Sequence, residues 1–292
     1  MATEVMVCVV GPSRGQGHLF KSGEGAGKSC LCYRFIHPGF DDFITEHPSI
    51  IASHEFQSTA VNNVHFLYWG RSRQNLPGRL GRGERTVDIH VVENTVLYED
   101  VTSKPFRSGG SKADNLDTYM KRALGKLESP GKISYWTRDG ISLPDTYKAQ
   151  RYPTNAGKMR RGFAVVVDVS MDGMEFDAQL QRTKTVCKTL KKADATYVLV
   201  LTKMESVVQE SVDKFHQLKK KEKIGADVIT TSSMCNYNIA TTFRIIAEKI
   251  LKTVYVNIPT FEQAAENEAR CKDKRPNGSS VLSPRNGSRH PR

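Results

Sequence analysis

The sequence predicts an α/β protein built on one mostly parallel β-sheet, with helices on both of its faces. Short apolar runs rich in valine recur along the chain, as in strands that are covered on both faces. Segments with apolar residues three and four positions apart lie between these runs, which is the spacing of amphipathic helices. A glycine-rich loop joins the first run to the first helix, as in proteins that bind phosphate groups. Strands that alternate with helices in this way favour parallel pairing.

Six segments are predicted to be strands because each is apolar and is bounded by turn residues. They are, in chain order, 4–11, 65–70, 86–94, 162–170, 196–203 and 226–233. The helical spacing predicts four helices between and after them. These helices are expected over 28–36, 175–193, 208–221 and 239–254.

Residues 95–161 interrupt this alternation between the third and fourth strands. Loops of this length are uncommon in compact domains and are usually functional or disordered. The segment contains a helical pattern at 115–127 and a short strand pattern at 133–136. Too few apolar residues recur in it to form a separate core. We therefore expect a large insertion within one domain that covers 1–258.

The formal net charge of +12 raises the question of nucleic acid or an acidic membrane as a partner. Half of this excess lies in 270–292, which holds seven basic residues and one acidic residue. This stretch is rich in Ser, Pro, Gly and Asn and has too little apolar surface to fold. We expect a solvated basic tail, with contact to RNA or phospholipid as the lesser alternative. The "KKKEK" run at 219–223 is expected to be the exposed end of a helix.

The remaining composition points to a cytoplasmic protein. No apolar run approaches the roughly 18 residues that a membrane span needs. The first residues carry neither the basic segment nor the cleavage site of a signal peptide. The six cysteines show no metal-ligand spacing, which favours a reducing compartment.

The stretch "FKSGEGAGKSCLC" at 20–32 carries a phosphate-binding motif, with an ordinary glycine-rich turn as the alternative. Gly25 and Gly27 allow backbone N–H groups to surround phosphate oxygens, and the helix that follows directs its N-terminus to the same place. Lys28 can reach the β- and γ-phosphates of a nucleotide, and the Ser29 hydroxyl can bind Mg²⁺. The residues expected to contact the nucleotide here are Glu24, Gly25, Ala26, Gly27, Lys28, Ser29 and Cys30.

Two later strand ends are candidates for reading the base. In small Ras-like GTPases an Asn-Lys-x-Asp loop binds guanine, and the corresponding positions here hold Thr202, Lys203 and Glu205. A carboxylate is thus retained, and the lysine can cover the ring. The alternative for this segment is an ordinary polar strand end. The next strand ends in "VITTSSMCN", which resembles the Ser-Ala-Lys loop that contacts guanine and adds Ser232, Ser233 and Met234 to the predicted site.

The groups needed for hydrolysis are incomplete. A GTPase uses an Asp-x-x-Gly turn to sense the γ-phosphate and a glutamine to position water. The third strand ends "VVENTVLYE", so that Glu93 takes the place of the aspartate, Val96 that of the glycine and Leu97 that of the glutamine. Glu24 would oppose the γ-phosphate by its charge. We expect nucleotide binding with little or no hydrolysis, and we assign no catalytic residue.

Beyond these motifs, the chain resembles the N-terminal GTP-binding domain of the large 190-kilodalton Rho GTPase-activating proteins, over roughly residues 4–274. The resemblance implies a Ras-like P-loop GTPase fold that is loaded with GTP and Mg²⁺ and behaves as a pseudoGTPase. The chain departs from the family at Ser22, Glu24 and Glu205. The residues that carry the resemblance are "GKSCLCYRFIHP" (27–38), "AVNNVHFLYWG" (60–70), "YMKRA" (119–123), "VLTK" (200–203) and "FEQ…KDK" (261–274).

The resemblance also bears on Mg²⁺ and on domain content. Within "HPSIIASHEF" it implies Ser53 as the second Mg²⁺ ligand, with Ser49 as the rival and ordinary loop serines as the alternative to both. In the family, FF modules follow the GTPase domain, and the catalytic Rho-GAP domain lies far downstream. Residues 258–274 resemble the start of the first FF module, so 259–292 are expected to hold a partial module and the basic tail. We expect the chain to lack the catalytic Rho-GAP domain.

Three functions remain open at this point. The first is a regulatory domain of Rho and cytoskeletal signalling that holds GTP·Mg²⁺ and acts through its folded shape on protein partners. The second is a slow but genuine small GTPase switch. The third is a basic scaffold or interaction protein that holds no nucleotide.

Overall fold

A computed structural model describes residues 3–11, 25–39, 66–77, 83–94, 116, 119–121, 123–124, 134–135, 153 and 155–251. The chain divides into two units, Met1–Ile258 and Pro259–Arg292, and all of the described residues belong to the first. None of the described helices is both long enough and apolar enough to cross a membrane.

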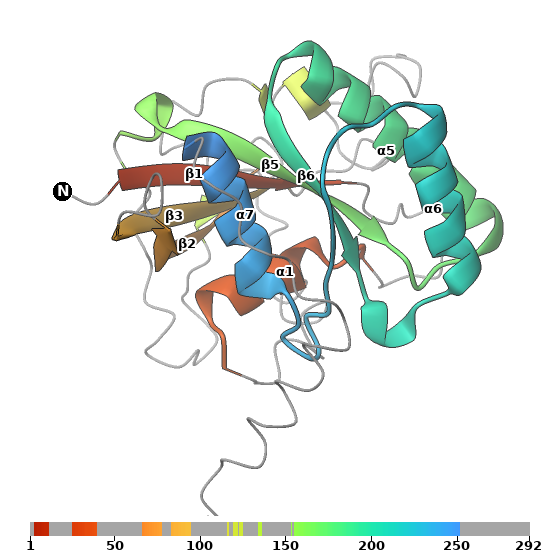
Figure 1. Cartoon of the computed structure of the whole chain (residues 1–292), viewed down its shortest axis with the longest axis horizontal. Coiled ribbons are helices and arrows are strands. Elements are labelled where there is room, and N and C mark those ends of the chain that lie inside the picture. Colours follow the sequence, from red (N-terminus) through yellow and green to blue (C-terminus); the bar gives the residue numbers. More distant parts are fainter. Residues whose placement is uncertain are drawn as a thin grey trace, which may run out of the picture. The chain divides into compact units, whose positions relative to one another are not determined.

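One β-sheet organises the described residues (Figure 1). Its seven strands, counted over the described ranges, span Thr3–Val10 (β1), Phe66–Pro77 (β2), Glu84–Asn94 (β3), Ser134–Tyr135 (β4), Arg160–Asp168 (β5), Thr196–Thr202 (β6) and Val228–Thr230 (β7). They lie in the order β4-β2-β3-β1-β5-β6-β7. All neighbours pair in parallel except β2 and β3, which are antiparallel. The predicted α/β class with a mostly parallel sheet is therefore confirmed.

All six predicted strands are present, but two differ in length. β2 extends to Pro77 instead of ending at residue 70, because its polar half pairs with β3 across the sheet. Arg73 lies opposite Asp88 there and donates to it from Nε and Nη2 at 2.8 and 3.1 Å. β7 is shorter than predicted and ends at Thr230, because the chain turns back on itself soon afterwards.

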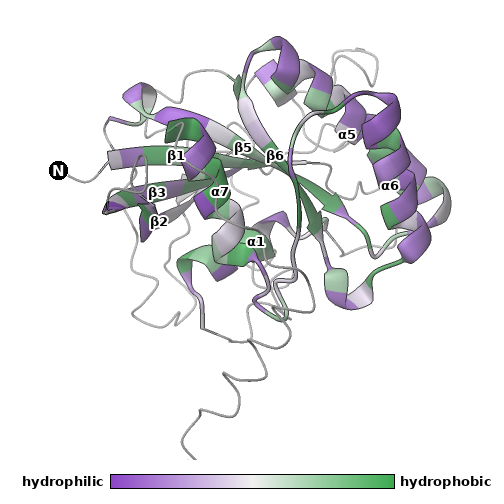
Figure 2. Cartoon of the chain, in the orientation of Figure 1, coloured by the Kyte–Doolittle hydropathy of each residue, from purple (hydrophilic) through white to green (hydrophobic). Residues whose placement is uncertain are grey.

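Within the described ranges, four helices that match the four predicted segments closely cover the two faces of the sheet. They span Lys28–Ile36 (α1), Gly173–Lys192 (α5), Gln209–Lys221 (α6) and Ile239–Leu251 (α7). Buried residues of α1 and α7 pack with one set of strand side chains, and buried residues of α5 and α6 pack with the opposite set. Figure 2 shows the corresponding pattern, with apolar residues along the central strands and polar residues on the outer surface of α6.

The inserted segment contributes to the second of these faces. Leu116, Tyr119, Met120 and Ala123 are buried in the same apolar cluster as α5. A short 3-10 helix, η5 (Ala156–Lys158), leads into β5.

The carboxyl ends of the parallel strands meet at one edge of the sheet. β1 lies between β3 and β5, and the helix that follows β1 covers the opposite face from the helix that follows β5. This is a topological switch point, where ligand sites of open α/β sheets form. The predicted nucleotide motifs follow β1, β3, β6 and β7, so the fold brings them to this edge.

Candidate functional site

The loop before α1 has the backbone that a phosphate site requires. Gly27 precedes the first helical residue with φ of 82°, a left-handed conformation that favours glycine. Its carbonyl accepts the first helical hydrogen bond from Leu31 N at 2.9 Å. A side chain added at Gly25 would meet open space. The N–H groups at the start of α1 therefore lie at the carboxyl edge of the sheet, with room beside them.

Lys28 is the first residue of α1, and its side chain is buried against the end of β1. Its side chain folds back so that Nζ donates to the carbonyl of Gly11 at 3.3 Å. Burial lowers the pKa of Lys28, and the nearby carboxylate of Glu93 acts in the opposite direction. The charged form of Lys28 is thus disfavoured by the loss of its hydration.

Ser29 and Glu93 form the centre of the site. Ser29 Oγ donates to Glu93 Oε1 at 2.9 Å, and Trp69 Nε1 donates to Glu93 Oε2 at 2.8 Å. Burial raises the pKa of Glu93, while the charge of Lys28 and the two hydrogen bonds oppose this rise. Trp69 was missed as a site residue, since its sequence string pointed only to the family. Trp69 lies at an irregularity in the pairing of β2 with β3, 24 positions before the buried acid that it contacts, and no local spacing indicates this contact.

The oxygens of Ser29 and Glu93 fit a hard divalent cation. Mg²⁺ binds through hydroxyl and carboxylate oxygens, and it usually takes one or two carboxylates from the protein together with substrate phosphates. Among the described residues, no group of three or more His, Cys, Asp or Glu side chains could hold a metal ion.

The predicted phosphate loop is joined to the first of the two predicted base-reading loops. Thr202 Oγ1 donates to the carbonyl of Ala26 at 2.8 Å. Lys203 has a left-handed backbone with φ of 62°, and its Nζ lies 2.8 Å from Oδ2 of the fully buried Asp168. Asp168 ends β5 and was missed in the sequence. Glu205 follows in the short helix η6 (Met204–Ser206) and is exposed.

The second base-reading loop begins with a closed turn. Ser232 and Tyr237 exchange two backbone hydrogen bonds at 3.2 and 2.8 Å, and Ser232 Oγ accepts from Cys235 N at 3.0 Å. Met204 N donates to Thr231 O at 3.2 Å, which joins this loop to the first one. The Ser232 side chain is thus used to hold the turn.

Arg34 connects this turn to α1, and sequence reasoning missed it. The side chain is buried, and its Nε and Nη2 donate to the carbonyls of Ser233 and Met234 at 2.9 and 3.1 Å. Its Nη1 donates to the carbonyl of Gly39, just beyond α1. The signal that could have found it is an arginine among the apolar residues of a short helix. One side chain therefore positions the predicted base-reading loop against the phosphate helix.

The inserted segment reaches the same place through Tyr119. Gly11 N donates to the Tyr119 hydroxyl at 3.3 Å, and the same hydroxyl donates to the Gly11 carbonyl at 3.4 Å. Burial raises the pKa of Tyr119. Gly11 has φ of 150°, and a side chain there would lie 2.6 Å from the Val166 carbonyl. The end of β1 is therefore fixed by its own backbone and by the insertion.

Of the predicted site residues, those from Gly25 to Cys30 and those of the two base-reading loops lie at one edge of the sheet. Cys30 is buried on α1, and burial raises its pKa to about 12, so its thiol is unreactive. Several predictions fall outside the described residues and remain predictions. They concern Ser22, Glu24, Ser49, Ser53, Val96 and Leu97.

The chain is similar to Rho GTPase-activating proteins of several animals. No protein-family model matches the chain. The chain is 34% identical over 261 residues to Rho GTPase-activating protein 35 of Rattus norvegicus and of Mus musculus. It is 29% identical over 258 residues to Rho GTPase-activating protein 190 of Drosophila melanogaster. The matches cover 86% of this chain but 16% of each relative, so the chain spans only a small part of their length. The resemblance to Rho GTPase-activating proteins is thereby confirmed, as similarity to one part of them.

Proposed function

We propose that the chain is a guanine-nucleotide-binding regulatory domain that holds GTP and Mg²⁺ with little or no hydrolysis. It would act in Rho and cytoskeletal signalling in the cytoplasm. The observation that carries this proposal is the contact between Ser29 and Glu93 beside the buried amine of Lys28.

The charges of this group favour a nucleotide with its metal. Burial disfavours the charged form of Lys28 and also that of Glu93. A phosphate anion near the amine and a divalent cation near the carboxylate would offset both penalties. Bound Mg²⁺ would supply positive charge to the phosphate oxygens. Ser29 and Glu93 would hold the metal, and Lys28 with the backbone N–H groups at Gly27 and the start of α1 would hold the phosphates.

The base side of the site favours guanine. Asp168 holds the ammonium of Lys203 in place, which orients the lysine stem at the end of β6. Glu205 is exposed beside it and can accept the two N–H protons of a guanine edge. Arg34 and Thr202 fasten the two base-reading loops to the phosphate helix and loop. These contacts preorganise the loops, which lowers the cost of ordering them on binding.

The described residues also favour slow chemistry. Glu93 contacts the start of α1 through Ser29, and each of its oxygens accepts a hydrogen bond, from Ser29 and from Trp69. A carboxylate held in this way is poorly placed to activate water. The predicted effects of Glu24, Val96 and Leu97 would act in the same direction. We therefore infer that the bound nucleotide stabilises the folded shape of the domain and is not turned over. We do not propose that the chain itself activates Rho.

The nucleotide content of the purified chain tests this proposal. Denaturing the full chain and separating the released small molecules by chromatography should yield GTP. Release of GDP would favour a slow GTPase switch, and absence of nucleotide would favour a basic scaffold. Lys28→Ala should lose the nucleotide. Lys192→Ala, at the exposed end of α5, removes the same charge and should retain it.

A further inference from the structure

The opposite edge of the sheet carries a dense group of lysines at the ends of two helices. α5 and α6 both run back along parallel strands, so both end at the amino-terminal edge of the sheet (Figure 1). We call the following residues the lysine cluster: Lys184, Lys188, Lys191, Lys192, Lys219, Lys220, Lys221 and Lys223.

A single carboxylate joins the two helix ends. Glu222 Oε1 lies 2.5 Å from Lys184 Nζ, and its Oε2 lies 3.1 Å from Lys188 Nζ. These ion pairs show that the two halves of the lysine cluster form one surface. The KKKEK run is thus the exposed end of a helix, as expected, but it is also half of a larger basic surface that the sequence did not show.

The lysine cluster holds a large share of the charge of the chain. Residues 184–194 and 219–224 contain eight lysines against Asp194 and Glu222, which gives +6 of the total net charge of +12. Five of these lysines are exposed and form no ion pair within the described part of the chain. They are Lys191, Lys192, Lys220, Lys221 and Lys223.

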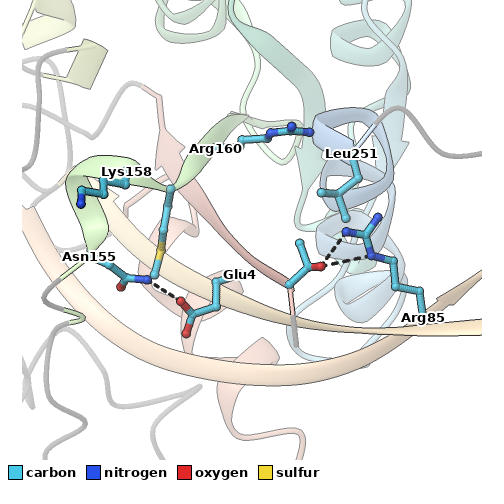
Figure 3. Close-up of a pocket in the computed structure, with 8 residues that line it drawn as sticks. Glu4, Arg85, Asn155, Lys158, Arg160 and Leu251 are labelled. Carbon is cyan, nitrogen blue, oxygen red and sulfur yellow. Dashed lines mark hydrogen bonds between the residues drawn. The ribbon is translucent and has the colours of Figure 1, made fainter. Parts of the chain in front are cut away.

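The same edge of the sheet also carries a basic pocket of about 340 Å³ at the starts of β1, β3 and β5 (Figure 3). Arg85 and Lys158 lie on opposite sides of it in this view, with Arg160 between them. Glu4 is the one acid among the described lining residues, and it accepts from Asn155 Nδ2 at 2.6 Å. The pocket therefore adds a net positive charge to this edge.

The types of side chain on this surface favour one class of acidic partner over RNA and protein. Specific RNA recognition relies on aromatic side chains that stack on bases, and protein interfaces rely on buried aromatic or apolar anchors. Among the described residues, the exposed large apolar side chains are Met174, Val207 and Met234, and all three lie in the loops of the carboxyl edge or at a helix start. Lysines act as mobile point charges and need no fixed geometry. A surface of this kind suits the diffuse negative charge of a lipid bilayer.

We propose that the amino-terminal edge of the sheet, formed by the lysine cluster and the basic pocket, docks on membranes that contain anionic phospholipids. Each lysine near such a surface strengthens binding by about fivefold. The candidate nucleotide site lies at the opposite edge and would face away from the bilayer. Docking is therefore independent of the proposed nucleotide binding.

Vesicle sedimentation with the full chain tests this proposal. The chain should sediment with vesicles of phosphatidylcholine that contain about 30% phosphatidylserine, and not with phosphatidylcholine alone. About 0.5 M salt should release it, because surface charges are screened within a few ångströms. Removing four charges should weaken binding by at least tenfold, since four lysines contribute well beyond that. The cluster variant is Lys191→Gln, Lys192→Gln, Lys220→Gln and Lys221→Gln.

Three further variants make the result specific. Replacing the same four lysines by arginine should preserve binding, which separates charge from any effect on helix stability. Neutralising four charges of the predicted tail should have little effect, although the change in net charge is identical. Lys28→Ala should bind vesicles normally even when it holds no nucleotide. The tail variant is Arg270→Gln, Lys272→Gln, Lys274→Gln and Arg275→Gln.

Three outcomes would overturn the proposal. One is equal sedimentation with both kinds of vesicle. Another is an equal loss in the tail variant and the cluster variant, which would assign binding to net charge alone. The last is binding of single-stranded polyuridine through the lysine cluster without binding of vesicles, which would assign the surface to RNA.

Discussion

Replacing Lys28 by methionine should change the stability of the chain in opposite directions with and without nucleotide. Methionine keeps the length and apolar stem of the side chain but removes its charge. The buried ammonium donates to the Gly11 carbonyl at 3.3 Å, and burial lowers the pKa of Lys28. The folded state therefore carries a cation at a cost in hydration that the variant does not have.

The two sides of this comparison can be given approximate sizes. Replacing both members of a buried charge pair by apolar groups of similar volume is often neutral or stabilising by up to about 4 kcal/mol, whereas removing one member leaves the other charge buried without a partner. In Lys28→Met the remaining Glu93 can take up a proton, because burial already raises its pKa, so we expect a net gain of about 1 kcal/mol for the nucleotide-free variant. GTP at a thousandfold excess over its Kd stabilises a competent protein by about 4 kcal/mol. The variant should lack this gain, so the order of stability reverses.

Thermal unfolding followed by circular dichroism measures both effects. The protein is first stripped of nucleotide with a chelator and phosphatase, and it is then measured alone and with GTP and Mg²⁺. A change of 1 kcal/mol corresponds to about 2–4 °C in Tm for a domain of this size. Lys192→Met is the matched control, because it is exposed at the end of α5 and should change neither measurement by more than about 0.5 kcal/mol.

Two results would refute this reasoning. If the nucleotide-free variant is less stable than the natural chain by 1 kcal/mol or more, the ammonium has a structural role and is not held ready for a phosphate. If GTP raises the Tm of both proteins equally, any nucleotide binds without Lys28, and the site has been assigned to the wrong place.

Three further predictions follow from buried groups. Burial lowers the pKa of His90 despite the nearby Glu4, so the unfolded chain takes up the proton at a higher pH than the folded chain does. The free energy of unfolding should therefore decrease as the pH falls below about 6.5. Chemical unfolding at several pH values should show this slope, and His90→Gln should reduce it. Arg34→Met should lower the preference for GTP over ATP by about tenfold or more in competition binding. The reason is that the carbonyls of the predicted base-reading loop lose charged donors worth about 1.5–3 kcal/mol each. An unchanged ratio of GTP affinity to ATP affinity would contradict the role given to Arg34. Gly11→Ala should destabilise the fold by about 2 kcal/mol or more in denaturant unfolding, whereas Gly225→Ala, which meets open space, should not.

The sequence predicted the framework well for a physical reason. Strands covered on both faces must be apolar at consecutive positions, and β1, β5 and β6 have such runs. α1 was predicted over its full length, Lys28–Ile36, because a glycine loop and a change of spacing mark its start. The second half of β2 escaped prediction, since its polar residues are held by pairing with β3 and not by burial.

The contacts that shape the candidate site could not be predicted in the same way. Arg34 and the Ser233 carbonyl are 199 positions apart, and Tyr119 and Gly11 are 108 apart. No local spacing encodes such a pair, because it depends on which strands become neighbours. The lysine cluster is hidden for the same reason: each half resembles an ordinary helix end until the sheet order places the two ends together.

The contacts of Gly11 would couple the proposed nucleotide to the inserted segment. Its carbonyl accepts from Lys28 Nζ, and its N–H and carbonyl both meet the hydroxyl of Tyr119 in the inserted segment. Drawing the ammonium toward a phosphate would leave this carbonyl to Tyr119 alone, which would strengthen the remaining contact and hold the insertion on the sheet. A bound nucleotide could then fix the surface of the domain without being hydrolysed. This is what a regulatory module that acts through its folded shape requires, and Tyr119→Phe would uncouple the insertion from the nucleotide while leaving Lys28 in place.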